Sequence, residues 1–166
     1  VEGAARAAAL TGVDMLTLHC LGGQAMLEAG QRGVEAAAAE RGGKAAATLG
    51  ITVLTSMDDA ALQRVGIDRS PADEVSLLAG VAKDAGISGV VCSPREASAL
   101  RQILGPQAYI VTPGVRPIGA DAGDQSRIAT PAEAFANGAS HVVIGRPITK
   151  DADPAAAFEA IAASLG

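Results

Sequence analysis

Short runs of β-branched and other apolar residues alternate along the chain with alanine-rich stretches of helical spacing. The apolar runs predict strands over 13–20, 45–55, 88–93, 108–114 and 141–145. The intervening periodicity predicts helices over 1–10, 22–40, 58–66, 71–85, 95–104, 131–137 and 154–164. Strands that alternate with helices are typical of a parallel sheet covered by those helices. The pattern therefore predicts an α/β protein of about five successive strand–helix units.

Several helix ends are marked by their residues. Ser70 and Thr130 each precede a proline and, further on, a glutamate, which is the usual signature of a helix N-terminus. Ser93 has the same pattern and predicts a helix that begins at Pro94. The glycines of "AGI" (85–87) and "NGAS" (137–140) suit helix C-termini, where a left-handed residue is common.

An open doubly wound sheet and a (β/α)8 barrel both fit five such units. Barrels commonly bind phosphate in the loops after their seventh and eighth strands. Here the last two predicted strands run into "TPGVRP" (112–117) and "IGRPIT" (144–149). If these are strands seven and eight, residues 1–166 are a single domain that forms the C-terminal part of a TIM (β/α)8 barrel, about its last five strand–helix units, without the N-terminal strands.

Composition narrows the class of protein. Hydrophobic residues make up 49% of the 166 residues and aromatic residues only 2%, without tryptophan, which nearly excludes aromatic platforms for nucleic-acid bases. The net charge of -5 argues against binding to nucleic acid or to an anionic membrane. No apolar run approaches the roughly 20 residues of a membrane span. Cys20 and Cys92 lack metal-ligand spacing, so we expect reduced thiols in a cytoplasmic protein.

The end of the last predicted strand suggests an anion site. An apolar run that stops at Gly145 and Arg146 brings backbone N–H groups and a guanidinium to one place, which suits phosphate. The long irregular stretch 113–131 carries Arg116, Gln125 and Arg127. This stretch is either a movable lid over a ligand or a solvated surface loop.

Five blocks carry a more specific signal: "TVLTSMDD" (52–59), "GVVCSPREA" (89–97), "VTPGVRP" (111–117), "GDQSRIATP" (123–131) and "VIGRPIT" (143–149). In this order they resemble bacterial orotidine 5'-phosphate decarboxylase, over essentially the whole chain. The resemblance implies a (β/α)8 barrel, usually a homodimer, that converts orotidine 5'-phosphate to uridine 5'-phosphate in pyrimidine biosynthesis. It implies no metal and no organic cofactor.

The resemblance also implies roles for particular residues. Arg116 and Arg146 are similar to the family's phosphate-binding arginines, with the backbone N–H groups of Gly145 and Arg146 beside them. Gln125 is similar to the lid glutamine that reaches between pyrimidine and phosphate. The "LTS" triplet supplies Thr55 and Ser56 at a strand's C-terminal end, where one or both would contact the nucleotide, with the pyrimidine amide as the expected contact of Ser56.

One departure from the family is large. Its chemistry depends on an Asp-x-Lys-x-x-Asp motif, and no such motif occurs in this sequence. We therefore assign no catalytic residue here and expect a C-terminal portion, inactive alone, with a possible companion N-terminal segment that carries the lysine and aspartates. The alternatives are a related barrel that acts on a sugar phosphate, and a non-catalytic protein that binds a phosphorylated metabolite.

Three further residues resemble catalytic groups without the spacing that would support the role. His19, at a strand end, and His141, at a strand start, are interpreted as structural. Cys92 has no histidine or aspartate nearby in the sequence and is interpreted as a small buried apolar residue.

Overall fold

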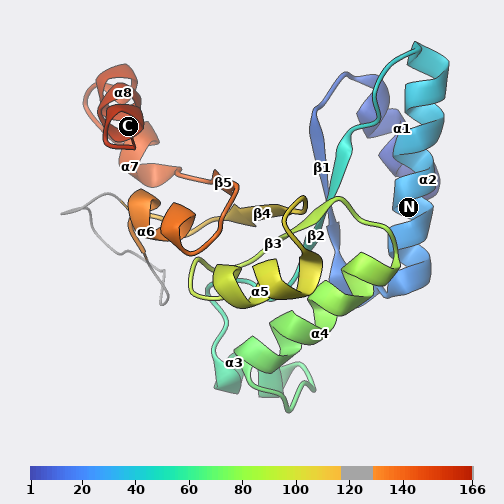
Figure 1. Ribbon diagram of the computed structural model, residues 1–166, viewed down its shortest axis with the longest axis horizontal. Coiled ribbons are helices and arrows are strands. Elements are labelled where there is room, and N and C mark those ends of the chain that lie inside the picture. Colours follow the sequence, from blue (N-terminus) through green and yellow to red (C-terminus); the bar gives the residue numbers. More distant parts are fainter. Residues whose placement is uncertain (117–128, 166) are drawn as a thin grey trace.

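The computed structural model of the chain describes residues 1–116 and 129–165. A single parallel sheet runs through them in the order β1-β2-β3-β4-β5, so that strand order repeats chain order (Figure 1). The strands are β1 (Met15–His19), β2 (Ala47–Ile51), β3 (Gly89–Val91), β4 (Tyr109–Thr112) and β5 (His141–Val142). The five predicted strands and the parallel α/β class are confirmed.

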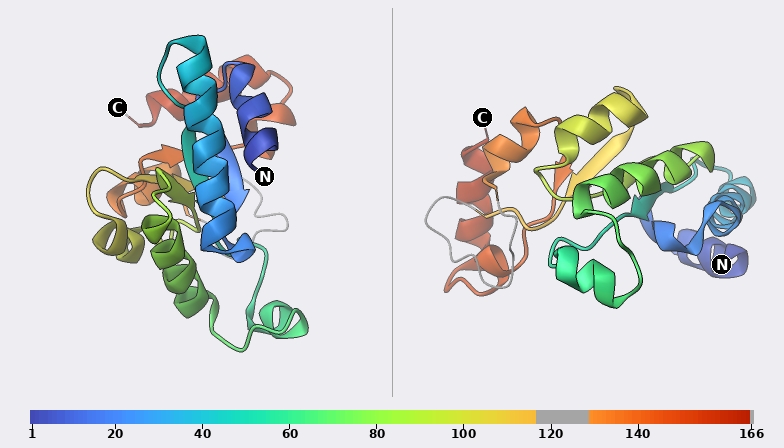
Figure 2. Two further views of the ribbon diagram at one scale, coloured as in Figure 1. Left: turned by 90° about the vertical axis from the view of Figure 1, so that its right-hand side faces the viewer. Right: turned by 90° about the horizontal axis from the view of Figure 1, so that it is seen from below.

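Helices connect the strands, and several of them cover one side of the sheet (Figure 2). They are α1 (Glu2–Leu10), η1 (Cys20–Gly22), α2 (Gln24–Arg41), α3 (Asp59–Arg64), α4 (Pro71–Asp84), α5 (Ala97–Leu104), α6 (Pro131–Ala136), α7 (Arg146–Thr149) and α8 (Pro154–Ala163). The two short ones, η1 and α7, were not predicted, because a single turn is too short to show helical periodicity.

Most of the predicted helix ends are confirmed. Ser70 caps α4 by accepting a hydrogen bond from the N–H of Asp73, and Thr130 forms a reciprocal capping box with Glu133 at the start of α6. Gly86 and Gly138 follow α4 and α6 with φ of +72° and +95°, a region that only glycine adopts without strain. These local signals are reliable because each satisfies backbone groups that the helix itself leaves unpaired.

The predicted helix start at Ser93 is wrong. The helix α5 begins at Ala97, and residues 94–96 form a turn in which the N–H of Glu96 donates to the carbonyl of Ser93 over 3.0 Å. The carboxylate of Glu96 in turn accepts the N–H of Ser93 over 2.8 Å. The hydrogen bonds between Ser93 and Glu96 therefore stabilise the turn that directly precedes α5, and they do not begin the helix.

All five strands are shorter than the ranges that the sequence predicts, and β2 and β5 show how the chain leaves the ladder. The N–H of Thr52 still reaches the carbonyl of Val91 over 3.2 Å, but the chain then leaves the sheet. Likewise Val143 donates to Thr112 over 3.0 Å just past the end of β5. The apolar runs over 45–55 and 141–145 thus continue past the hydrogen-bonded ladder. Their last residues belong to the segments that follow the carboxyl ends of β2 and β5.

The two faces of the sheet have different surroundings. On the helix side, the hydroxyl of Thr48 donates to Gln31 of α2 over 2.6 Å, and Val90 and Ile110 are completely buried. Successive strand residues point to opposite faces, so Thr17 and His19 lie on the inner face, where both are exposed. The core therefore sits between sheet and helices, and the inner face is only partly covered by the described residues.

Candidate functional site

A cavity of about 190 Å³ opens at the carboxyl ends of β2, β3 and β4. Two of the predicted site residues, Thr55 and Ser56, line it. The other lining residues are Ile51, Val53, Leu54, Val91, Cys92 and Pro113. A mainly apolar wall with a few polar groups is typical of a pocket for a small organic ring.

Thr55 and Ser56 lie beyond the strand end at which the sequence placed them. They follow Thr52 and Val53 in a turn between β2 and α3, where the N–H of Met57 donates to the carbonyl of Leu54 over 2.9 Å. Asp58 then caps α3 by accepting the N–H of Ala61 over 2.8 Å. This turn and cap hold the half-buried Thr55 and the exposed Ser56 at the cavity wall.

Arg116 is the most informative residue of the predicted site. It follows β4 and is only 7% exposed. The backbone N–H of Arg116 donates to the carbonyl of Ala129 over 2.9 Å, and the guanidinium donates to the carbonyl of Val115 over 2.9 Å. Across residues 1–116 and 129–165 no carboxylate pairs with it. A buried cation without a counter-ion is costly, and an anion bound there would remove that cost.

Gly145 and Arg146 follow β5, the neighbour of β4. Gly145 is the N-cap of α7 and Arg146, which is exposed, is its first residue. In the register of the sheet Thr112 pairs with Val142, and each arginine is the fourth residue after its member of that pair. Both arginines therefore lie at the same end of the sheet, just after the carboxyl ends of the adjacent strands β4 and β5.

Gln125, the predicted lid glutamine, lies outside the described residues, as does Arg127.

Sequence reasoning missed part of the cavity wall. Cys92 is 1% exposed, as its interpretation as a buried apolar residue predicts, but it also lines the cavity together with Val91. The carboxylate of Glu96, 8% exposed, fixes the turn that follows Cys92. Ser93 and Glu96 have the spacing of a capping box. That spacing is the sequence signal that could have predicted the hydrogen bond from the N–H of Ser93 to the carboxylate of Glu96.

The two histidines lie at different ends of the sheet. His141 begins β5, at the end remote from the cavity, where its ring packs edge-to-face on Tyr109 with a centroid distance of 5.5 Å and its Nδ1 lies 3.1 Å from the hydroxyl of Ser140. A structural role for His141 is consistent with these contacts. His19 ends β1 on the exposed inner face, and its ring makes no hydrogen bond to the described residues, so no described hydrogen bond supports the structural interpretation of His19.

In the described part of the chain no three histidine, cysteine, aspartate or glutamate side chains gather as metal ligands. None of the helices described there has the length and apolar character needed to cross a membrane. Both cysteines are buried, and neither forms a disulfide.

Comparison with known proteins gives consistent matches. Residues 1–161 match the family model described as "Orotidine 5'-phosphate decarboxylase / HUMPS family". Proteins named orotidine 5'-phosphate decarboxylase from Moorella thermoacetica and Halorhodospira halophila are 52% and 53% identical over 99% of this chain, which covers 66% and 68% of their lengths. A crystal structure of the enzyme from Lactobacillus acidophilus superposes with a TM-score of 0.85 at 36% identity, over 99% of this chain and 69% of that one. The chain thus spans about two thirds of the length of its relatives.

Proposed function

Because the chain belongs to the orotidine 5'-phosphate decarboxylase / HUMPS family, we propose that it supplies the phosphate- and nucleotide-binding half of a decarboxylase. The reaction converts orotidine 5'-phosphate to uridine 5'-phosphate and CO2 in pyrimidine biosynthesis. The relatives named for this activity match 98–99% of the chain, which supports assigning the same substrate to its site.

The observation that carries the proposal is the buried guanidinium of Arg116, without a carboxylate partner among the described residues, at the end of β4. A phosphate dianion bound there neutralises the cation and accepts its N–H groups in the planar arrangement that arginine offers. Arg146 approaches the same phosphate from the next strand end, together with the backbone N–H groups of Gly145 and Arg146.

The cavity beside β2 supports a place for the pyrimidine ring. Its apolar wall, which includes Val53 and Cys92, suits the faces of a planar ring, and the hydroxyls of Thr55 and Ser56 suit its polar edge. We assign Ser56 to the pyrimidine amide and Thr55 to the nucleotide as well. Gln125 reaches between the pyrimidine and the phosphate in this assignment.

The chemistry defines what these residues contribute. Loss of CO2 leaves carbanion character at C6 of the ring, which requires a positioned ammonium group among carboxylates to stabilise and protonate it. The Asp-x-Lys-x-x-Asp motif that would supply these groups is not in the sequence. Lys83 is engaged on the outer side, where its ammonium group donates to the carbonyl of Ile103 over 2.7 Å. The chain's own contribution is then to bind the phosphate, and binding energy from that remote group orients the ring for reaction.

The proposal has several corollaries. A companion segment supplies the lysine and aspartates, and the complete enzyme is a cytoplasmic homodimer that uses no metal or organic cofactor. The 166 residues act as a single domain, since one sheet extends from β1 to β5. Neither Cys20 nor Cys92 forms a disulfide, which suits a reducing compartment.

Calorimetric titration of the chain with uridine 5'-phosphate, uridine and inorganic phosphate tests the binding role. We expect uridine 5'-phosphate to bind most tightly, and Arg146→Ala to weaken it by about tenfold or more, the effect of losing a charge-assisted hydrogen bond. Arg64→Ala, at an exposed arginine in the last turn of α3, is the matched control and should leave binding unchanged. Equal affinity for uridine 5'-phosphate and inorganic phosphate would eliminate the pyrimidine assignment.

A decarboxylation assay separates the catalytic proposal from a purely binding one. The chain alone should release no CO2 from orotidine 5'-phosphate, and the chain completed with a relative's motif-bearing segment should. Nucleotide binding without turnover in the completed protein would instead favour a non-catalytic phosphometabolite-binding protein.

A further inference from the structure

The candidate cavity opens where β2 and β3 separate. Their ladder ends with Ile51 opposite Val91, and beyond it Thr52 donates both its N–H and its hydroxyl to the carbonyl of Val91, over 3.2 Å and 2.8 Å. The chain then leaves β3 through residues 53–56, all of which line the cavity. Cys92 therefore stands in the cavity wall at the point where, within the described structure, β3 no longer has a strand beside it on the β2 side.

The next backbone N–H group after this point needs an acceptor. The N–H of Cys92 donates to the carbonyl of Val111 in β4 over 3.1 Å. Because successive strand residues direct their N–H groups to opposite sides, the N–H of Ser93 in a continued strand would point toward β2. Ser93 is completely buried, and a buried N–H without an acceptor is costly. Its acceptor is the carboxylate of Glu96, at 2.8 Å.

The backbone of Glu96 is itself held firmly. Its N–H donates to the carbonyl of Ser93 over 3.0 Å, and its carbonyl accepts the N–H of Leu100, a completely buried residue of α5, also over 3.0 Å. From α6, the side-chain amide of Asn137 donates to the carbonyl of Pro94 within the same turn over 3.4 Å. The carboxylate of Glu96 thus joins the start of a packed helix to the end of β3.

We propose that Glu96 is a positioning residue for the nucleotide. Its carboxylate takes the place of a neighbouring strand for the N–H of Ser93, and this fixes Cys92 in the wall on which the pyrimidine ring packs. The identity of that ring rests on the function proposed above. Glu96 acts through Ser93 and Cys92, so it is not a catalytic residue.

This role concerns the ring and not the phosphate. The phosphate is assigned to Arg116 and Arg146, which follow β4 and β5, whereas Glu96 holds the turn that follows β3. Removal of the carboxylate should therefore weaken the binding of a nucleotide and leave the binding of inorganic phosphate unchanged. A residue that only stabilises the fold would change both affinities in the same proportion, through the fraction of folded chain.

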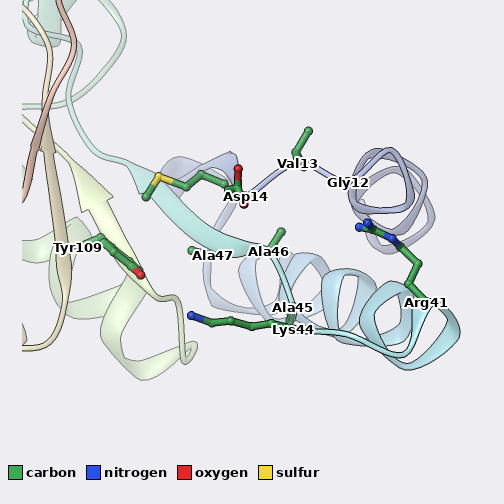
Figure 3. Close-up of a pocket in the computed structure, with 10 residues that line it drawn as sticks. Gly12, Val13, Asp14, Arg41, Lys44, Ala45, Ala46, Ala47 and Tyr109 are labelled. Carbon is green, nitrogen blue, oxygen red and sulfur yellow. The ribbon is translucent and has the colours of Figure 1, made fainter.

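A second cavity gives a reference at the opposite end of the sheet. It has a volume of about 290 Å³ and lies at the amino ends of the strands, lined by Gly12, Val13, Asp14, Met15, Arg41, Lys44, Ala45, Ala46, Ala47 and Tyr109. Figure 3 shows the side chains of Lys44 and Tyr109 pointing toward each other across it. Tyr109 is the chain's single tyrosine, the chain has no tryptophan, and Tyr109 pairs with Gly89 at the start of β3. Its fluorescence therefore reports whether β3 is disturbed along its length or only beyond Val91.

The first experiment needs no ligand. Glu96→Ala removes the acceptor, and Glu96→Gln keeps an acceptor oxygen on a side chain of the same length. The alkylation rates of the two thiols by iodoacetamide are measured by peptide mass spectrometry, with Cys20 as internal reference, since both cysteines are 1% exposed. In Glu96→Ala, Cys92 should react about tenfold faster or more relative to Cys20, because an unsatisfied N–H favours local opening. Glu96→Gln should react as the unaltered chain does, and Tyr109 fluorescence should be the same in all three.

Three results of this experiment overturn the proposal. One is an unchanged alkylation rate of Cys92 in Glu96→Ala. The others are an equal rise at Cys20 and a change in Tyr109 fluorescence, since either one shows that the whole sheet is loosened and that Glu96 is a general structural residue.

The second experiment is calorimetric titration of the same variants with uridine 5'-phosphate and with inorganic phosphate. Glu96→Ala should raise the dissociation constant for uridine 5'-phosphate about tenfold and change that for phosphate by less than twofold, and Glu96→Gln should restore both. Gly33→Ala is the matched control for stability, because its added Cβ would lie 2.4 Å from the carbonyl oxygen of Glu2 in the contact of α2 with α1. It should bind both ligands as the unaltered chain does. Equal losses of affinity for both ligands in Glu96→Ala overturn the proposal.

Failure of the proposed function gives a different result. If the unaltered chain binds uridine 5'-phosphate no more tightly than phosphate, the pyrimidine assignment is contradicted, and the alkylation of Cys92 still decides whether Glu96 holds the wall. If the unaltered chain prefers uridine 5'-phosphate and Glu96→Ala keeps that preference in full, the proposed function stands and the positioning role of Glu96 is refuted.

Discussion

Arg116→Met should raise the stability of the unliganded chain and lower its affinity for nucleotide. The side chain is 7% exposed, and the described carboxylates leave it unpaired, so the folded chain carries a desolvated charge. Replacing buried charges by apolar groups of similar volume is often neutral or stabilising by about 1–4 kcal/mol. The hydrogen bond to Val115 is lost in the variant, which places the expected gain toward the lower part of that range.

The effect on binding has the opposite sign. A hydrogen bond from a charged group to phosphate contributes about 1.5–3 kcal/mol, so the dissociation constant for uridine 5'-phosphate should rise by roughly 10- to 150-fold. Equilibrium unfolding in urea gives the free energy of unfolding, and calorimetric titration gives the affinity. Arg64→Met, at an exposed arginine on α3, should change stability by no more than about 0.5 kcal/mol.

The opposite signs are what test the reasoning. If Arg116→Met unfolds more easily than the unaltered chain by several kcal/mol, the guanidinium is a structural group whose charge is already compensated. If affinity for the nucleotide is unchanged, Arg116 does not contact the phosphate.

Four other predictions concern stability. Gly33→Ala should destabilise the chain by about 1–2 kcal/mol in urea unfolding, since an added Cβ would lie 2.4 Å from the carbonyl oxygen of Glu2 and overpacking outweighs the gain in helix propensity. Gly80→Ala, with no atom within 4 Å of the added Cβ, should instead stabilise it by about 0.5–1 kcal/mol. Burial raises the pKa of the Cys20 thiol to about 11 from an ordinary value of 9.0. The thiol therefore ionises more readily in the unfolded chain, so the free energy of unfolding should fall as pH rises from 9 to 11, and Cys20→Ala should remove that part of the fall. Ser70→Ala, which deletes the cap of α4, should cost about 1 kcal/mol in the same unfolding assay, and an unchanged midpoint would show that the cap does not contribute.

Local patterns in the sequence predict the elements well. The caps at Ser70 and Thr130 and the glycines that end α4 and α6 depend on contacts within a few residues, which a sequence pattern records directly. The cap predicted at Ser93 failed because the same serine–glutamate spacing also stabilises an isolated turn. Strand ends were less well predicted, because the length of a ladder depends on the neighbouring strand.

The candidate site was predicted only in part. Thr55 and Ser56 were found from their resemblance to a family motif, and the structure places both in one cavity wall. The contribution of Cys92 to that wall and the burial of Arg116 could not be predicted, since each depends on residues far away in the sequence. Gly145 and Arg146 were correctly placed after the last strand, but the helix α7 that begins there was not foreseen.

The sequential strand order has a consequence for how the chain folds. Every ladder joins strands that are consecutive in the chain, as in a solenoid, so each unit draws its cohesion from its nearest neighbours. Nucleation could then occur at the best-packed pair of units and propagate outward in both directions. Unfolding should accordingly begin at the ends, and the two-residue β5 should fray before the centre of the sheet.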